Sequence, residues 1–173
     1  MNEQRYRAVI AWFNARPAAK QAAYLVSRGA VGAVYLLYIT LLVILAWQRN
    51  PLWFGAAGVP AAAFVVGTAL RAAIDRPRPY VTLGYTPLFP KKDTGCSMPS
   101  RHCFSAAAIA VAAWGCSVPL GIVLGVLAVV IALSRVLTGV HYISDVVAGL
   151  AFGSGFALVG WQIALAALRV CGL

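Results

Sequence analysis

The chain is divided into long apolar tracts separated by short polar segments. Residues 29–48 contain no charged side chain and are long enough to cross a bilayer as a helix, for which about 20 apolar residues are needed. Residues 52–70 form a second tract of this kind. A third tract covers 103–133 and is interrupted by Gly-Cys-Ser-Val-Pro at 115–119, which predicts a helical hairpin. With a last tract over 146–168, the pattern predicts five crossings and no strands.

This pattern predicts an all-α protein, a polytopic transmembrane helix bundle of about five spans with an N-terminal interfacial helix. The composition agrees, because 62% of the residues are hydrophobic and only 10% are charged, far from the average of soluble proteins. A chain of 173 residues has room for one compact domain. We therefore expect a single membrane-embedded domain over residues 1–173, in a multi-pass protein of the cell membrane.

Residues 1–28 differ from the rest because basic side chains are scattered among apolar ones. The basic residues are Arg5, Arg7, Arg16, Lys20 and Arg28. A cleavable signal peptide would need a clean apolar core, so none is expected. The pattern favours an amphipathic helix lying at the level of the lipid headgroups, where cations meet anionic lipid. A solvated basic tail is the alternative.

The net charge of +10 at pH 7 is also typical of proteins that bind nucleic acid. Here the basic residues are spread over loops and span ends, and the predicted spans leave no soluble domain to present a groove. We therefore expect membrane lipids with anionic headgroups as partners, and no nucleic acid.

The side chains capable of chemistry concentrate on one face of the predicted bundle. Because consecutive spans alternate in direction, the segment 75–99, the start of the third span and the turn between the last two spans all meet there. The residues gathered on this face are Arg71, Arg76, Arg78, Lys91, Lys92, Ser100, Arg101, His102, Arg135, His141 and Asp145. Ionisable groups at membrane depth are costly and indicate a functional site. Arginines extending toward an ordinary polar interface would explain some of them, but not both histidines.

His141 and Asp145 are four residues apart, a spacing that places them on one face of a helix. The carboxylate can then hold one nitrogen of the imidazole and leave the lone pair of the other free to attack. A satisfied polar contact is the alternative interpretation of this pair.

Arginines near this pair indicate an anionic ligand. Arg71, Arg78 and Arg135 present planar groups of donors that match phosphate oxygens. A phosphoryl group in transfer needs electrostatic stabilisation of this kind. Ser100 follows Pro99 at the expected start of a helix, a position that suits both an N-cap and a bound phosphate.

These residues resemble the three motifs of the type 2 phosphatidic acid phosphatase superfamily, which also includes soluble acid phosphatases and vanadium haloperoxidases. The third motif, Ser-Arg, five residues, His, three residues, Asp, is complete at residues 134–145. The second, normally Pro-Ser-Gly-His, is Pro-Ser-Arg-His at residues 99–102. The first, normally Lys, six residues, Arg-Pro, is present at residues 71–79 with Arg in the first place. The three motifs are in the family's order over residues 71–145.

Two positions depart from the family pattern. Arg71 stands where lysine is usual, which keeps the charge and adds a planar fork of donors. Arg101 stands where glycine is usual, and its side chain either favours a diphosphate or a larger anionic headgroup or points to the interface. An alternative register through Arg76 would place Ala69 in the cationic position, so we prefer Arg78.

The resemblance implies a phosphatase mechanism that uses no metal and no other cofactor. His141 would attack phosphorus and form a phosphohistidine, while Asp145 orients its ring. His102 would protonate the leaving lipid oxygen and then activate water. The phosphoryl oxygens would be held by Arg71, Arg78, Ser100, Arg101 and Arg135, with main-chain N–H groups at positions 101 and 102.

The implied substrate is a phosphomonoester or diphosphate on a lipid. Phosphatidic acid, phosphatidylglycerol phosphate and polyprenyl phosphates or diphosphates, such as undecaprenyl diphosphate, all fit. The alternative functions are a non-catalytic protein that binds lipid phosphate and a channel or carrier for anions. Zinc on the two histidines and Asp145 is disfavoured, because the surrounding arginines oppose a further cation.

The topology leaves two alternatives. Family members usually have six spans, and the segment 1–28 would then stand in for a missing first one. The cations on the active-site face would place it in the cytoplasm by the positive-inside rule, whereas the bacterial relatives commonly work on the outer face. The sequence carries no indication of the oligomeric state.

Overall fold

The structure is a computed structural model that describes residues 1–90 and 94–172. These residues form seven helices and no strand. The helices are α1 (Glu3–Asn14), α2 (Pro17–Trp47), α3 (Leu52–Ile74), α4 (Pro79–Thr82), α5 (Arg101–Cys116), α6 (Val118–Leu137) and α7 (Ile143–Val170). The predicted all-α helix bundle is thereby confirmed.

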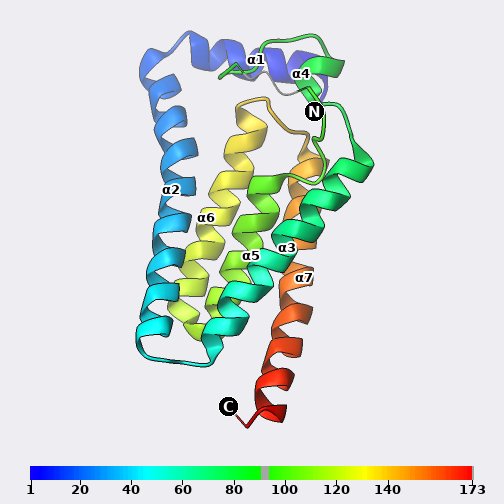
Figure 1. The fold of residues 1–173 in the computed structure, drawn as a ribbon. Coiled ribbons are helices and arrows are strands. Elements are labelled where there is room, and N and C mark those ends of the chain that lie inside the picture. Colours follow the sequence, from blue (N-terminus) through cyan, green and yellow to red (C-terminus); the bar gives the residue numbers. More distant parts are fainter. Residues whose placement is uncertain (91–93, 173) are drawn as a thin grey trace.

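The long helices run side by side, while α1 and α4 lie across one end of them (Figure 1). We call this end the α1 end of the bundle. Helix α5 occupies the centre and packs against α2, α3, α6 and α7. Its buried residues include six alanines, and such short side chains let the backbones of neighbouring membrane helices approach closely.

Four helices, α2, α3, α6 and α7, are long and apolar enough to cross a membrane. The predicted hairpin over 103–133 is present as α5 and α6, and the chain turns at Ser117, whose backbone is extended. Helix α5 has 16 residues and is therefore about 24 Å long, less than the roughly 30 Å of the hydrocarbon layer. Four of the five predicted crossings thus have a full span's length, and the shorter fifth is enclosed by the others.

The predicted N-terminal segment 1–28 divides into two parts. Helix α1 lies across the bundle (Figure 1) and buries Tyr6 and Ile10. These two side chains pack in one cluster with Tyr85 and Val140. Residues 17–28 instead form the first turns of α2, where Pro17 occupies the start of the helix, the position that suits its fixed backbone angle.

Helices α5 and α7 approach closely because α7 carries glycine at two facing positions. A Cβ atom at Gly153 would lie 2.2 Å from the carbonyl oxygen of Phe104, and one at Gly149 would lie 2.9 Å from that of Ser100. The two glycines are four residues apart and share one helix face. Their absence of side chains therefore sets the distance between the start of α5 and the start of α7.

We predict that Gly153→Ala destabilises the fold even though alanine is the better helix former by about 1 kcal/mol. The added methyl group meets main-chain atoms that cannot move aside, and overpacking of this kind costs about 1–3 kcal/mol. The measurement is the thermal unfolding midpoint in detergent, followed by tryptophan fluorescence. Gly155→Ala is the matched control, because nothing lies within 4 Å of a Cβ atom there; equal midpoints for the two variants would contradict the close contact.

Candidate functional site

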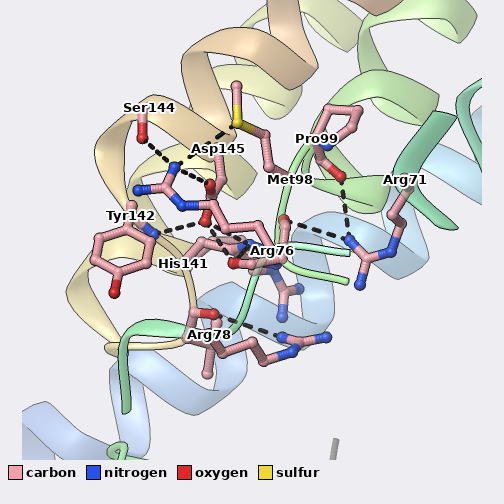
Figure 2. Close-up of polar contacts among 12 residues, drawn as sticks. Arg71, Arg76, Arg78, Met98, Pro99, His141, Tyr142, Ser144 and Asp145 are labelled. Carbon is pink, nitrogen blue, oxygen red and sulfur yellow. Dashed lines mark hydrogen bonds and ion pairs between the residues drawn. The ribbon is translucent and has the colours of Figure 1, made fainter. Parts of the chain in front are cut away.

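The site lies at the α1 end of the bundle, where four segments meet (Figure 2). The end of α3 and the segment after it carry Arg71, Arg76 and Arg78. The segment before α5 carries Ser97 and Ser100, and the turn from α6 to α7 carries His141. Residues from the three sequence motifs are thus brought together in space.

Asp145 is the junction of these segments and is completely buried. Its Oδ1 atom accepts a hydrogen bond of 2.9 Å from Nη1 of Arg76. Its Oδ2 atom accepts from the hydroxyl of Ser97 and, at 2.9 Å, from the main-chain N–H of Tyr142. The main-chain N–H of Ser100 donates to its carbonyl oxygen at 3.0 Å. One residue thereby fixes three loops around a buried negative charge.

Ser97 lies between Asp145 and His141. The Nδ1 atom of His141 is 3.5 Å from Oδ2 of Asp145 and 3.3 Å from the Ser97 hydroxyl oxygen. Because the serine proton is donated to the carboxylate, the Ser97 oxygen can only accept from His141. This arrangement places the ring proton on Nδ1 and leaves the lone pair of Nε2 free, the form required of a nucleophile.

His141 lies in the turn before α7 and is 3% exposed. Burial lowers its pKa, because the imidazolium would lose its hydration, and the hydrogen bond to Asp145 opposes this effect. The charges of Arg78 and Arg71 lower the pKa further. The net direction is downward, so the ring is neutral at pH 7.

The sequence placed Arg76 on this face and in an alternative register of the first motif, but it indicated neither the contact of Arg76 with Asp145 nor a role for Ser97. Arg76 forms an ion pair with Asp145, donates to the Ser144 hydroxyl at 2.8 Å and lies over the ring of Tyr142. Because a buried carboxylate needs a charged partner, the position of Asp145 at a span end was a signal for a nearby arginine. Nothing in the sequence marks Ser97, since its contact depends on the path of the segment before α5.

Two of the arginines assigned to phosphate, Arg71 and Arg78, are buried beside this network. Nη1 of Arg71 donates to the carbonyl oxygens of Pro99, at 3.1 Å, and Ser97, at 3.4 Å. Nη1 of Arg78 donates to the carbonyl oxygen of Val140, next to His141, at 3.5 Å. These contacts fix the two side chains against the main chain of the other motifs, as Figure 2 shows.

The second motif begins α5. Ser100 is its N-cap residue and is fully buried, but among the described residues its side chain makes no capping hydrogen bond. The hydroxyl is therefore not used to cap the helix. Arg101 is exposed and His102 is half-buried. Three charged residues between α4 and α5 lie outside the described residues, namely Lys91, Lys92 and Asp93.

Two cavities of about 410 Å³ each open at the site. Arg71, Arg78 and Arg101 line the first, together with Thr94 and Cys96. His102 and Arg135 line the second, together with the side chains of Tyr24, Ser27 and Arg28 from α2. Both are large enough for an anionic headgroup, and both are lined by arginines. Within residues 1–90 and 94–172, no cluster of three or more His, Cys, Asp or Glu side chains could hold a metal ion.

Helix α1 is connected directly to the turn that carries His141. The hydroxyl of Tyr6, which is 1% exposed, donates to the carbonyl oxygen of His141 at 3.0 Å. Burial raises the pKa of Tyr6 to about 12, so the hydroxyl keeps its proton. Tyr6 stacks on Tyr85, whose hydroxyl donates to the carbonyl oxygen of Gly139 at 2.9 Å. Two tyrosines therefore hold this turn from the side of α1.

Comparison with known proteins identifies the family. A family model of the PAP2 superfamily matches residues 52–169, more than half of the chain, so the chain belongs to the PAP2 superfamily. The crystal structure of Aquifex aeolicus LpxE shares the fold with a TM-score of 0.71 and 24% identity, over 93% of this chain and 94% of that one. The crystal structure of the transmembrane PAP2-type phosphatidylglycerolphosphate phosphatase of Bacillus subtilis shares the fold with a TM-score of 0.57 and 22% identity, over 92% of each chain. No curated protein matches the sequence.

The first prediction from this site concerns the charge of His141. We expect its imidazole to titrate below the ordinary value of about 6.5, because burial disfavours the cation. The measurement is a ¹⁵N-histidine NMR titration of the protein without a polyhistidine tag, in which His102→Gln leaves His141 as the single histidine. A midpoint above 6.5 would mean that attraction to Asp145 outweighs burial.

The second prediction concerns Tyr6→Phe. This change leaves the buried carbonyl group of His141 without its donor, so we expect a loss of stability of about 1–3 kcal/mol and a shift of the His141 NMR signal. Thermal unfolding in detergent and the ¹⁵N-histidine spectrum measure the two effects. Tyr35→Phe removes a hydroxyl from a half-exposed tyrosine and serves as the control. An unchanged His141 signal in Tyr6→Phe would contradict a positioning role of α1.

Proposed function

We propose that the protein is an integral membrane lipid phosphatase that hydrolyses a phosphomonoester or diphosphate through a phosphohistidine at His141. The observation that carries this proposal is the buried imidazole of His141, held by Ser97 and Asp145 and near the charges of Arg71 and Arg78. A nucleophile with a free lone pair next to several fixed cations suits attack on a phosphoryl group. Membership of the PAP2 superfamily supports the same chemistry.

In the first step, Nε2 of His141 attacks phosphorus and the bond from phosphorus to the lipid oxygen breaks. The electron pair of that bond passes to the lipid oxygen, which takes a proton from His102. Arg71, Arg78 and Arg135 compensate the charge on the phosphoryl oxygens, together with the hydroxyl of Ser100 and the N–H groups at the start of α5, where Arg101 begins the helix. In the second step, water gives a proton to His102 and attacks phosphorus, and the bond to Nε2 breaks to release phosphate.

The candidate substrates share an anionic group at the membrane surface on an apolar tail. Phosphatidylglycerol phosphate is supported by the fold shared with the Bacillus subtilis phosphatase, and phosphatidic acid and polyprenyl phosphates or diphosphates present the same chemistry. The proposal includes a multi-pass location in the cell membrane. Neither a metal nor another cofactor has a role in it, because the arginines provide the positive charge at the phosphoryl oxygens.

The test is phosphate release from lipid mono- and diphosphates by the purified protein in detergent with EDTA present. We expect release by the wild type and a loss of at least about 10³-fold in His141→Ala, as for removal of a nucleophile in other enzymes. Arg169→Gln changes an exposed cation at the opposite end of α7 and should leave the rate unchanged. Acid-labile labelling of the wild type by ³²P-substrate, absent in His141→Ala, would identify the intermediate.

Two results would overturn this proposal in favour of the alternatives. A folded protein that binds lipid phosphate without releasing phosphate would be a binding protein. Anion flux into vesicles that survives His141→Ala but not Arg78→Gln would indicate a channel or carrier, because transport needs the cations of a pathway and no nucleophile.

A further inference from the structure

The two cavities at the site differ in which side chains of the proposed mechanism line them. His102 and Arg135 line it from α5 and α6, and Arg28 lines it from α2. The other cavity, with Arg71, Arg78 and Arg101, is lined by no histidine among the described residues. Since His102 protonates the leaving oxygen in the proposed mechanism, the leaving part of the substrate belongs in the cavity with His102. This step rests on the proposed function.

Arg135 lines this cavity from α6 and is held in place by α2. Arg135 is 8% exposed, and its Nη2 atom donates to the carbonyl oxygen of Ser27 at 3.3 Å. Its buried Nε atom has no hydrogen-bond partner among the described residues. The guanidinium of Arg135 therefore contributes positive charge to the wall of this cavity, which suits an anionic group.

Arg28 brings a second guanidinium to the same cavity from outside the shared family region. It precedes the family match at residues 52–169, and its guanidinium lies over the ring of Tyr24 at 5.3 Å. The charge-free tract 29–48 begins at the next residue. Arg28 therefore lies at the boundary between the hydrocarbon layer and the headgroups, where a lipid carries its phosphate.

Two further spaces adjoin this cavity through shared lining residues. Val31 and His102 also line a narrow space of about 10 Å³ with Tyr35 and Ile109. Tyr35 and Ile109 in turn line a cavity of about 190 Å³ between α2 and α3, with Phe64 among its side chains. The tail of a leaving group bound near Arg28 would thus lie beside apolar side chains of α2 and α5.

We propose that Arg28 is a specificity residue that binds an anionic phosphate on the leaving part of the substrate, so that the enzyme prefers lipid diphosphates to lipid monophosphates. In a diphosphate, His141 attacks the terminal phosphorus and the bond to the bridging oxygen breaks. The electron pair passes to the bridging oxygen, which takes a proton from His102, and Arg28 stabilises the negative charge that remains on the leaving lipid monophosphate. A monophosphate releases a neutral lipid alcohol after protonation, which offers Arg28 no charge to bind.

The test compares two substrates with the same acyl chains, diacylglycerol diphosphate and phosphatidic acid, in neutral detergent micelles. Arg28→Gln should lower kcat/KM for the diphosphate at least about 10-fold, which corresponds to about 1.4 kcal/mol, and change it less than about 2-fold for the monophosphate. Arg28→Lys should restore part of the loss. Lys20→Gln removes the same charge from the same helix, where Lys20 is bonded to Asn14, and should change neither rate.

Binding separates a failure of this inference from a failure of the proposed function. In His141→Ala, a lipid methylenebisphosphonate should bind more tightly than the matching phosphonate, and adding Arg28→Gln should abolish the difference. If the wild type hydrolyses neither substrate, the proposed function fails while this comparison still tests Arg28. Equal loss on both substrates, or an unchanged preference in Arg28→Gln, would overturn the inference. If added phosphatidylglycerol displaced the bisphosphonate but not the phosphonate, Arg28 would bind the headgroup of a neighbouring lipid, and the inference would be overturned.

Discussion

The structure depends on one buried carboxylate, Asp145, in a protein with few acidic residues. An isolated charge at such a site would be strongly unfavourable, and Asp145 is stabilised by Arg76, Ser97 and the N–H of Tyr142. These partners belong to three separate segments of the chain. Satisfying one charge therefore also sets the positions of the loops at the α1 end, and His141 takes its orientation from the same contacts.

Close packing below the site makes this arrangement possible. The N–H of Ser100 reaches the carbonyl oxygen of Asp145 at 3.0 Å because Gly149 and Gly153 let α5 approach α7. Arg71 is then close enough to donate to the carbonyl oxygen of Pro99. Arg71 and Arg78 are thus held by main-chain carbonyl groups, which move little.

Much of this could be predicted from the sequence, for reasons that differ between elements. Lengths of apolar tracts are local, so the helices and the all-α fold follow from them, and the scarcity of ionisable residues marked His102, His141 and Asp145. The role of Ser97 depends on the course of a loop, which no local pattern encodes. The start of α2 was misplaced because the basic residues of 17–28 obscured its continuity with the apolar tract, although Pro17 marked its beginning. The assigned roles of the site residues stay predictions.

The position of the spaces lined by His102, Tyr35 and Phe64 has a consequence for how the protein meets its ligand. These spaces lie between α2 and the helices α3 and α5, and Tyr35 and Phe64 beside them are 49% and 42% exposed. A lipid that enters there stays dissolved in the bilayer throughout. Encounter is then diffusion in two dimensions, and occupancy depends on the mole fraction of the lipid in the membrane. Dilution of the whole suspension with buffer would leave that occupancy unchanged, whereas dilution with inert lipid would reduce it.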